Sequence, residues 1–178
     1  GHAIADALFG RVNPGGKLPV TVARDAGQLP VFYNYKPSAR RGYLFAEVSP
    51  LYPFGYGLSY TSFAFGIPTL SSTGIGPDEG VTVRVPVTNT GSRAGDEVVQ
   101  VYLRDDVSSV TRPVKELAGF RRVTLQPGET KQVDIVLPPR VFALWNREME
   151  RVTEPGTFTI MAGPSSEDLQ SVTLEVTP

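Results

Sequence analysis

Residues 81–105 read VTVRVPVTNTGSRAGDEVVQVYLRD, and this stretch decides the fold class. Every second residue of its first run is a valine: Val81, Val83, Val85 and Val87. Its second run alternates in the same way, with Val99, Val101 and Leu103 on one side and Val98, Gln100, Tyr102 and Arg104 on the other. A period of two is typical of a strand that buries one face. Gly91 and Gly95 separate the runs, so we expect two strands joined by a turn.

Three later runs follow the same pattern: KQVDIVLPP (131–139), TFTIMAG (157–163) and SVTLEVT (171–177). Their expected inward residues are Val133, Ile135, Leu137, Phe158, Ile160, Ala162, Val172, Leu174 and Val176. Turns at Pro127-Gly128 and Pro155-Gly156 separate the strands. These features predict a mainly β fold, a two-sheet sandwich of the immunoglobulin or fibronectin type III kind.

Two positions interrupt the strand pattern. Pro86 inside an alternating run suggests an edge strand or a bulge, because proline cannot donate to a sheet ladder. PPRVFALWNR (138–147) has a helix-like spacing, and we expect Phe142 and Trp145 to point into the core.

The first ~65 residues follow different rules, as a short α/β stretch and an extended wrapping segment. HAIADALFG (2–10) places Ile4, Ala7 and Leu8 at helical spacing, and Gly10 is a plausible stop. NPGGKLPVTV (13–22) predicts a turn and a short strand. The run 23–57 is irregular and rich in Pro, Gly, Tyr and Arg, and so long a structureless run predicts a segment that wraps another body.

The stretch SPLYPFGYGLSYTSFAF (49–65) combines rings with backbone breakers. Glycine allows close backbone approach, and rings supply large contact area with few rotamers to order. We therefore expect Tyr52, Phe54, Tyr56 and Tyr60 to dock on a large surface, much of it outside this chain. In SVTRPVKELAGF (109–120), expected to be an ordered loop, Arg112 and Lys115 are the further candidate docking residues.

Composition excludes several function classes. The 178 residues carry a formal net charge of -1 without a basic stripe, so no nucleic-acid partner is expected. The arginine pairs 40–41 and 121–122 are interpreted as solvated loop charges. Without cysteine there is no disulfide, thiolate nucleophile or thiolate metal site. No apolar run approaches the ~20 residues of a membrane helix, and the start does not have the form of a signal peptide. We expect the chain to be a piece of a longer protein.

No side chains form a convincing catalytic or metal site. His2 is the single histidine and lies at the chain start, a poor place for a pre-organised base. No metal or cofactor is expected; an all-oxygen calcium site at Asp105 and Asp106 remains as a weak alternative. The carboxylate pairs Asp105-Asp106, Asp96-Glu97 and Glu148-Glu150 are interpreted as exposed charges at turns, with the first pair pointing apart. Trp145 and the tyrosines could instead stack on sugar rings.

Six segments in order carry a specific resemblance: ALFGRVNPGGKLPVT (7–21), LPVFYNYKP (29–37), PLYPFGYGLSYTSF (50–63), VTNTGSRAGDEVVQVYL (87–103), SSVTRPVKELAGFRRVTLQPGET (108–130) and EPGTFTIMAGPSS (154–166). Together they resemble the C-terminal end of glycoside hydrolase family 3, in the β-glucosidase and β-xylosidase type that ends in a fibronectin type III-like domain. The resemblance covers nearly the whole chain.

The resemblance implies that residues 1–62 are the C-terminal tail of an α/β sandwich domain plus a linker, and that residues 63–178 are the fibronectin type III-like domain. It places the nucleophilic aspartate and the acid/base glutamate upstream of Gly1, so no catalytic residue is assigned here. The implied partners are the N-terminal catalytic domains of the same enzyme, through which a β-glucoside or β-xyloside is hydrolysed. A periplasmic or extracellular bacterial location fits the family.

Two alternatives remain at this point. A stand-alone binding or adhesion module would fold fully alone and expose an aromatic platform, but the first segment has no use in it. An independent hydrolase lacks a suitable pair of carboxylates and a well-placed histidine.

Overall fold

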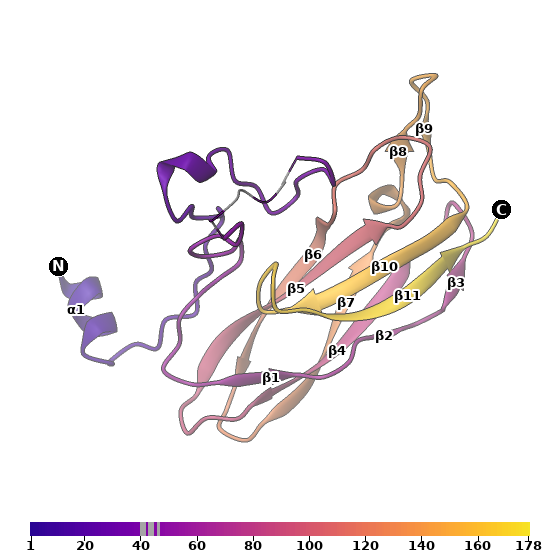
Figure 1. Cartoon of the computed structure of the whole chain (residues 1–178). Helices are drawn as coiled ribbons and strands as arrows, with labels where there is room; N and C mark the ends of the chain where they lie inside the picture. Colours follow the sequence, from indigo (N-terminus) through magenta and orange to yellow (C-terminus); the bar gives the residue numbers. More distant parts are fainter. Residues whose placement is uncertain (40–41, 43–44, 46) are drawn as a thin grey trace.

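The computed structural model describes residues 1–39, 42, 45 and 47–178, and its main body is a β-sandwich (Figure 1). One sheet centres on β4 (Val81–Asn89), which pairs with β7 (Thr130–Leu137) and with the short strands β1 (Phe63–Phe65) and β2 (Thr69–Leu70). The other sheet has the order β3-β11-β10-β5-β6. Its strands are β3 (Gly74–Ile75), β11 (Gln170–Val176), β10 (Gly156–Gly163), β5 (Gly95–Asp105) and β6 (Glu116–Leu125). The predicted two-sheet sandwich is confirmed.

The alternating apolar residues of the five predicted strands form the core between the sheets. Val83, Val85, Val87, Val99 and Val101 are fully buried. Phe158 of β10 meets Phe142 edge to face, with ring centroids 5.4 Å apart. Each alternating face thus buries against the opposite sheet, and this burial is the main stabilising term of the domain.

Strand β6 is the one long strand that the alternation does not predict. A register irregularity falls between Val101 and Tyr102 of the neighbouring β5, so the side-chain period of the pair is broken there. Gly119 of β6 is required because a Cβ at this position would lie 2.8 Å from Ile135 Cγ2. Arg121 and Arg122 therefore lie on a strand and not in a loop, while Arg40 and Arg41 lie outside the described residues.

Pro86 does not mark an edge strand, but the alternative expectation of a bulge agrees with the ladder beside it: the register against β4 shifts by one residue between the pairs Phe65–Val87 and Thr69–Arg84. Strand β4 is paired on both sides, but its second neighbour is interrupted between β1 and β2. Pro86 lies opposite that interruption, where its carbonyl accepts a hydrogen bond from the Gly66 amide at 2.9 Å. Because N–H and C=O of one strand residue point to the same side, the missing donor of proline faces the gap.

Between β7 and β10 the chain forms the 3-10 helix η2 (Pro139–Val141) and a hairpin of β8 (Leu144–Trp145) and β9 (Arg151–Val152). The hairpin extends beyond both main sheets (Figure 1). Phe142 is buried as predicted, whereas Trp145 is 60% exposed. The prediction of a core tryptophan is wrong because residue 145 already belongs to the protruding hairpin.

Residues 1–62 contain the helix α1 (His2–Leu8) and the 3-10 helix η1 (Ala26–Gln28), and otherwise lack regular structure in their described part. Gly10 ends the helical region with a positive φ of 73°, as the sequence predicts. The short strand expected within residues 13–22 is absent; only an isolated bridge joins Val22 to Tyr52. Among the described residues, no helix is both long and apolar enough to cross a bilayer.

Candidate docking surface

The extended segment lies on the outer face of the five-stranded sheet. The side-chain amide of Gln100 donates to the carbonyl oxygens of Gly55 at 3.2 Å and Pro164 at 2.6 Å. Its amide oxygen accepts from the Tyr102 hydroxyl at 2.6 Å. Both β5 side chains are at least 97% buried, although they point away from the sandwich core. Strand β5 is therefore buried on both faces, and residues 53–56 supply part of the second cover.

Gly55 is required at this contact. Its φ is 80°, a region that favours glycine, and a Cβ built on it would overlap the Gln100 side chain. The Phe54 carbonyl accepts from the Ser166 amide at 3.0 Å, in the β10–β11 loop. The backbone of the aromatic stretch is thus bonded directly to the sandwich.

Three rings fill the space between the segment and the sheet. Tyr33 stacks on Phe54 with ring centroids 4.3 Å apart, and meets Tyr102 edge to face at 5.7 Å. The Tyr33 hydroxyl accepts from the Leu117 amide of β6 at 3.2 Å. Burial raises the pKa of Tyr102 above its usual value, so its hydroxyl remains a donor at neutral pH. The expectation that the anchor of the aromatic stretch lies mostly outside the chain is therefore wrong for Phe54.

A buried ion pair adds a charged contact. The Lys17 ammonium lies 2.6 Å from the Glu97 carboxylate, with side-chain exposures of 15% and 6%. Glu97 also accepts from the Val98 amide at 2.9 Å. Its sequence neighbour Asp96 accepts a hydrogen bond from the Thr124 hydroxyl and pairs with Arg122, both on β6. Both carboxylates lie in strand β5, so their interpretation as exposed turn charges is wrong.

The start of the segment is held by the β4–β5 turn. The Asn13 side chain donates to the Ala94 carbonyl at 3.0 Å and accepts from the Tyr60 amide at 2.8 Å. Arg93 donates to the Gly10 carbonyl at 2.6 Å and lies over the Tyr60 ring, 5.5 Å from its centroid. These bonds orient α1 relative to the sandwich without covering its apolar side chains.

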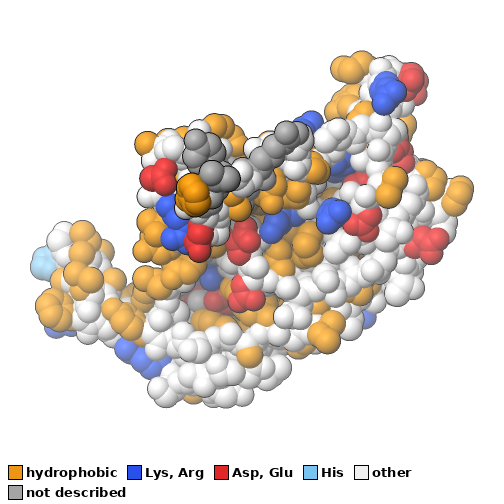
Figure 2. Space-filling view, viewed as in Figure 1, with side chains coloured by type: hydrophobic (Ala, Val, Ile, Leu, Met, Phe, Trp, Pro, Cys, Tyr) orange, Lys and Arg blue, Asp and Glu red, His pale blue; other side chains and the backbone are white. Residues whose placement is uncertain are grey.

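The same segment presents most of the exposed apolar side chains of the protein. Of the nineteen large hydrophobic side chains exposed among the described residues, thirteen lie in residues 1–62. They are Ile4, Leu8, Phe9, Val12, Val20, Leu29, Phe32, Phe45, Val48, Leu51, Tyr52, Leu58 and Tyr60. Figure 2 shows hydrophobic side chains over α1 and the irregular segment. A surface of this size and apolarity is typical of an interface with another folded body.

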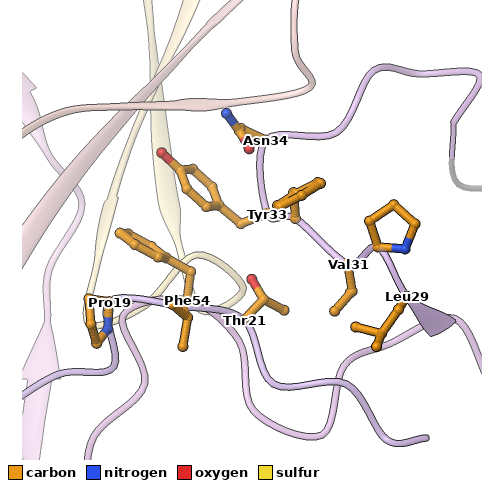
Figure 3. A pocket seen from close by; sticks show the side chains of 10 residues that line it. Pro19, Thr21, Leu29, Val31, Tyr33, Asn34 and Phe54 are labelled. Atoms are coloured by element: carbon orange, nitrogen blue, oxygen red, sulfur yellow. The ribbon is translucent and has the colours of Figure 1, made fainter. Parts of the chain in front are cut away.

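One part of this surface forms an apolar groove of about 680 Å³. Its walls come from three separate stretches of the segment, around Thr21, Val31 and Phe54 (Figure 3). The stacked rings of Tyr33 and Phe54 form one wall, and Leu29 lies at the opposite end. The groove contains no charged residue, so it suits apolar side chains.

The six candidate docking residues have different surroundings. The rings of Tyr52 and Tyr60 are 41% and 46% exposed, and the Tyr60 hydroxyl donates to the Ala7 carbonyl at 2.7 Å. Phe54 and Tyr56 are half-buried, and Tyr56 contacts Tyr52 with ring centroids 5.0 Å apart. The structure thus brings Tyr52 and Tyr56 together, whereas Phe54 packs on Tyr33 and Tyr60 bonds to α1.

Arg112 and Lys115 are engaged inside the chain. Arg112 pairs with Asp105 at 3.4 Å and Glu116 at 2.7 Å, and donates to the Phe142 carbonyl at 3.1 Å. Lys115 donates to the Ser166 carbonyl. Both side chains therefore order the loop before β6.

The adjacent carboxylates of Asp105 and Asp106 are not arranged as a pair for glycoside hydrolysis. Asp105 turns toward Arg112, whereas Asp106 accepts from the Thr159 hydroxyl at 3.0 Å, so the two point apart as predicted. Asp105 is 96% buried, contrary to the expected exposed charge, and burial raises its pKa despite the opposing Arg112 guanidinium. Glu148 and Glu150 are exposed at the β8–β9 turn, as predicted.

No group of three or more His, Cys, Asp or Glu side chains is placed to hold a metal ion in the part of the chain that the structure describes. His2 lies at the exposed start of α1.

The sequence does not identify Gln100, Tyr102 and Tyr33 as contact residues. A signal was present in the run Val98–Leu103, where apolar residues occupy both sides of the strand. Strands that are buried on both faces read as continuous apolar runs instead of alternating ones.

Comparison with known proteins identifies both parts of the chain. Residues 1–60 match the glycosyl hydrolase family 3 C-terminal domain, and residues 97–166 match the fibronectin type III-like domain. A β-xylosidase of Formosa agariphila is 50% identical, and a periplasmic β-glucosidase of Salmonella typhimurium is 44% identical. Each alignment covers 99% of this chain but only 25% and 24% of the relative.

Solved structures agree with these sequences. The β-glucosidase EmGH1 of Erythrobacter marinus superposes with a TM-score of 0.95 at 49% identity, over 99% of this chain and 23% of that one. The β-glucosidase of Listeria innocua in complex with glucose gives 0.94 at 38% identity, over 100% and 26%. The chain thus spans about a quarter of the length of the proteins it matches, and it belongs to glycoside hydrolase family 3, as the C-terminal portion of its β-glucosidase and β-xylosidase type.

Proposed function

We propose that this chain is the structural C-terminal portion of a retaining β-glycosidase, which hydrolyses terminal β-linked glucose or xylose. In this proposal, residues 1–62 complete the α/β sandwich domain and residues 63–178 brace it. In this proposal the two catalytic carboxylates belong to the remainder of the enzyme, because the relatives extend well beyond this chain and the adjacent carboxylates of Asp105 and Asp106 point apart.

One observation carries the proposal: the apolar side chains of α1 and the wrapping segment are ordered but exposed. Leu8 and Phe9 are 73% and 84% exposed, although α1 is positioned by the bonds of Arg93 and Tyr60. A helix that presents apolar residues to water in a defined orientation is explained by a partner surface that covers them. Since the relatives are about four times longer than this chain, the catalytic portion of the same enzyme supplies that partner.

The exposed rings of Tyr52 and Tyr60 and the groove beside Phe54 extend this docking surface. Arg112 and Lys115 contribute indirectly, because they order the loop that contacts the segment. The sandwich thereby acts as a platform: it holds residues 10–39 and 47–57 in the shape that the α/β domain requires.

Amide hydrogen exchange of the full-length enzyme and of the 178-residue chain tests the proposal. Residues 2–12 and 29–34 are expected to exchange at least about tenfold more slowly in the full-length enzyme. The core strands β4 and β5 serve as the internal control, with similar protection in both samples. Equal exchange of residues 2–12 in the two samples would contradict the proposal.

A further inference from the structure

The β8–β9 hairpin is an ordered element whose tip is apolar. Its base is anchored by Leu144 and Phe142, which are 93% and 99% buried. Trp145 of β8 and Met149 of the turn are 60% and 75% exposed. Figure 2 shows hydrophobic side chains at this protruding tip, beside charges of both signs.

The turn of the hairpin is fixed by its own hydrogen bonds. The Asn146 side chain accepts from the Glu150 amide at 2.8 Å, and the Asn146 amide donates to the Glu150 carbonyl at 3.0 Å. Met149 has a φ of 63°, in the left-handed region where glycine is usual. A long apolar side chain that is exposed at a conformationally costly position contributes nothing to the sandwich core, so its role lies in contact with another surface.

The hairpin and the docking surface of residues 1–62 are linked through one loop. Their shared neighbour is the loop 106–115. On one side this loop receives the segment, since the Val114 amide donates to the Tyr35 carbonyl at 2.9 Å and Lys36 donates to the Thr111 carbonyl at 3.1 Å. On the other side, Arg112 donates to the Phe142 carbonyl at the hairpin base.

We propose that the hairpin is a second docking element, whose Trp145 and Met149 side chains insert into an apolar site on the catalytic portion of the same enzyme. This inference rests on the proposed function and adds a second, separate point of attachment. Trp and Met are typical anchors at interface centres, and the surrounding Arg147, Glu148 and Glu150 form the polar rim that interfaces have. The mixed charges of the rim disfavour a nucleic acid as occupant.

Thiol labelling provides the test, because this chain contains no cysteine. Three single variants are prepared both in the full-length enzyme and in the 178-residue chain: Met149→Cys for the hairpin, Leu8→Cys for the first surface and Val136→Cys as the control. Val136 is 69% exposed on β7, in the sheet opposite the one that the segment covers. A maleimide is added, and the labelling rate of each peptide is followed by mass spectrometry.

We expect the thiols at 149 and 8 to react at least about tenfold more slowly in the full-length enzyme than in the chain alone, and the thiol at 136 to react equally in both. Protection at 8 without protection at 149 overturns the hairpin inference and leaves the proposed function intact. No protection at either position overturns both. Two further outcomes overturn the inference. Protection at 149 that rises with protein concentration assigns the hairpin to contact with a second copy. Protection that appears only with added cello-oligosaccharide assigns it to a glycan.

Discussion

The side-chain amide of Gln100 donates a hydrogen bond to the main-chain carbonyl of Gly55, 45 residues earlier in the chain. This bond joins the middle of a sandwich strand to a residue near the end of the irregular run 23–57, on the sheet face that points away from the sandwich core. It shows that the two parts of the chain share a buried layer. The predictions below test how strongly this layer and the sandwich core contribute to stability.

Gly55→Ala is expected to destabilise the contact between segment and sheet by roughly 2 kcal/mol or more, because alanine is strained at a φ of 80° and its Cβ overlaps Gln100. Exchange of the amides of residues 53–57 should accelerate. Gly128→Ala is the matched control: its φ is 74°, but nothing lies within 4 Å of the added Cβ. Equal effects of both variants on residues 53–57 would show that the Gln100 contact is unimportant.

Tyr102→Phe removes the hydroxyl that donates to Gln100 at 2.6 Å and leaves a buried amide oxygen without its donor. The free energy of unfolding, measured in urea, should fall by about 1–3 kcal/mol. Tyr60→Phe, which loses a bond at an exposed site, should cost less than about 1 kcal/mol. A loss for Tyr60→Phe as large as that for Tyr102→Phe contradicts the assignment of a buried layer.

Lys17→Met leaves the Glu97 carboxylate buried without its cation, and is expected to cost roughly 3 kcal/mol. The double variant Lys17→Met/Glu97→Leu should recover a large part of that loss, because it removes the unpaired charge as well. Arg84→Met breaks the exposed pair with Asp134, where both side chains are about half exposed, and should change stability by less than about 0.5 kcal/mol.

Phe142→Ala should lower the free energy of unfolding by about 3–5 kcal/mol, because it opens a cavity beside Phe158. Trp145→Ala should change it by less than about 0.5 kcal/mol in the 178-residue chain, since the indole is largely exposed. A large loss for the tryptophan variant in this chain would contradict the exposed hairpin tip.

Asp96 and Asp105 are expected to give stability profiles of opposite slope with pH. The Thr124 hydroxyl and the Arg122 guanidinium lower the pKa of Asp96. Its stabilising contribution is therefore present above the unfolded pKa of ~3.9 and is lost as the pH falls through the folded pKa. Relative to wild type, Asp96→Asn should lose about 0.5–1 kcal/mol near neutral pH and progressively less below about pH 4.

Burial raises the pKa of Asp105, so the sign reverses. The contribution from its titration is present below the unfolded pKa and is lost as the pH rises through the folded pKa. The stability of wild type minus that of Asp105→Asn should therefore decrease with rising pH, while the same difference for Asp96→Asn increases. Urea unfolding between about pH 3 and pH 8 measures both, and parallel slopes would refute the assignment.

The sandwich could be predicted from the sequence because one physical signal, the alternation of apolar residues, repeats in β4, β5, β7, β10 and β11. The alternation did not predict β6, where a register irregularity and Gly119 disturb the side-chain period. It also failed at Trp145, because helical spacing after Phe142 gives no sign that the chain leaves the domain in a hairpin.

The docking surface could be predicted only in part. The rings and glycines around Phe54 indicated a segment held against a surface, but periodicity cannot indicate which surface. The covering of Gln100 depends on Gly55, 45 positions earlier, and that of Tyr102 on Tyr33, 69 positions earlier. Such distant contacts leave no local pattern beyond the two-sided apolar run of β5. Arg112 shows the opposite error, since its residue type suggested an intermolecular role while its partners lie within the chain.

The double burial of β5 also affects how this protein can be recombined. A chimera that carries residues 63–178 onto a foreign enzyme would bring Gln100 and Tyr102 into solvent, and would lose the rings of Tyr33 and Phe54 that cover them. A transplant that begins near Gly10 would keep this cover in place, as well as the Asn13 and Arg93 contacts. The unit of exchange among such enzymes is therefore longer than the sandwich itself.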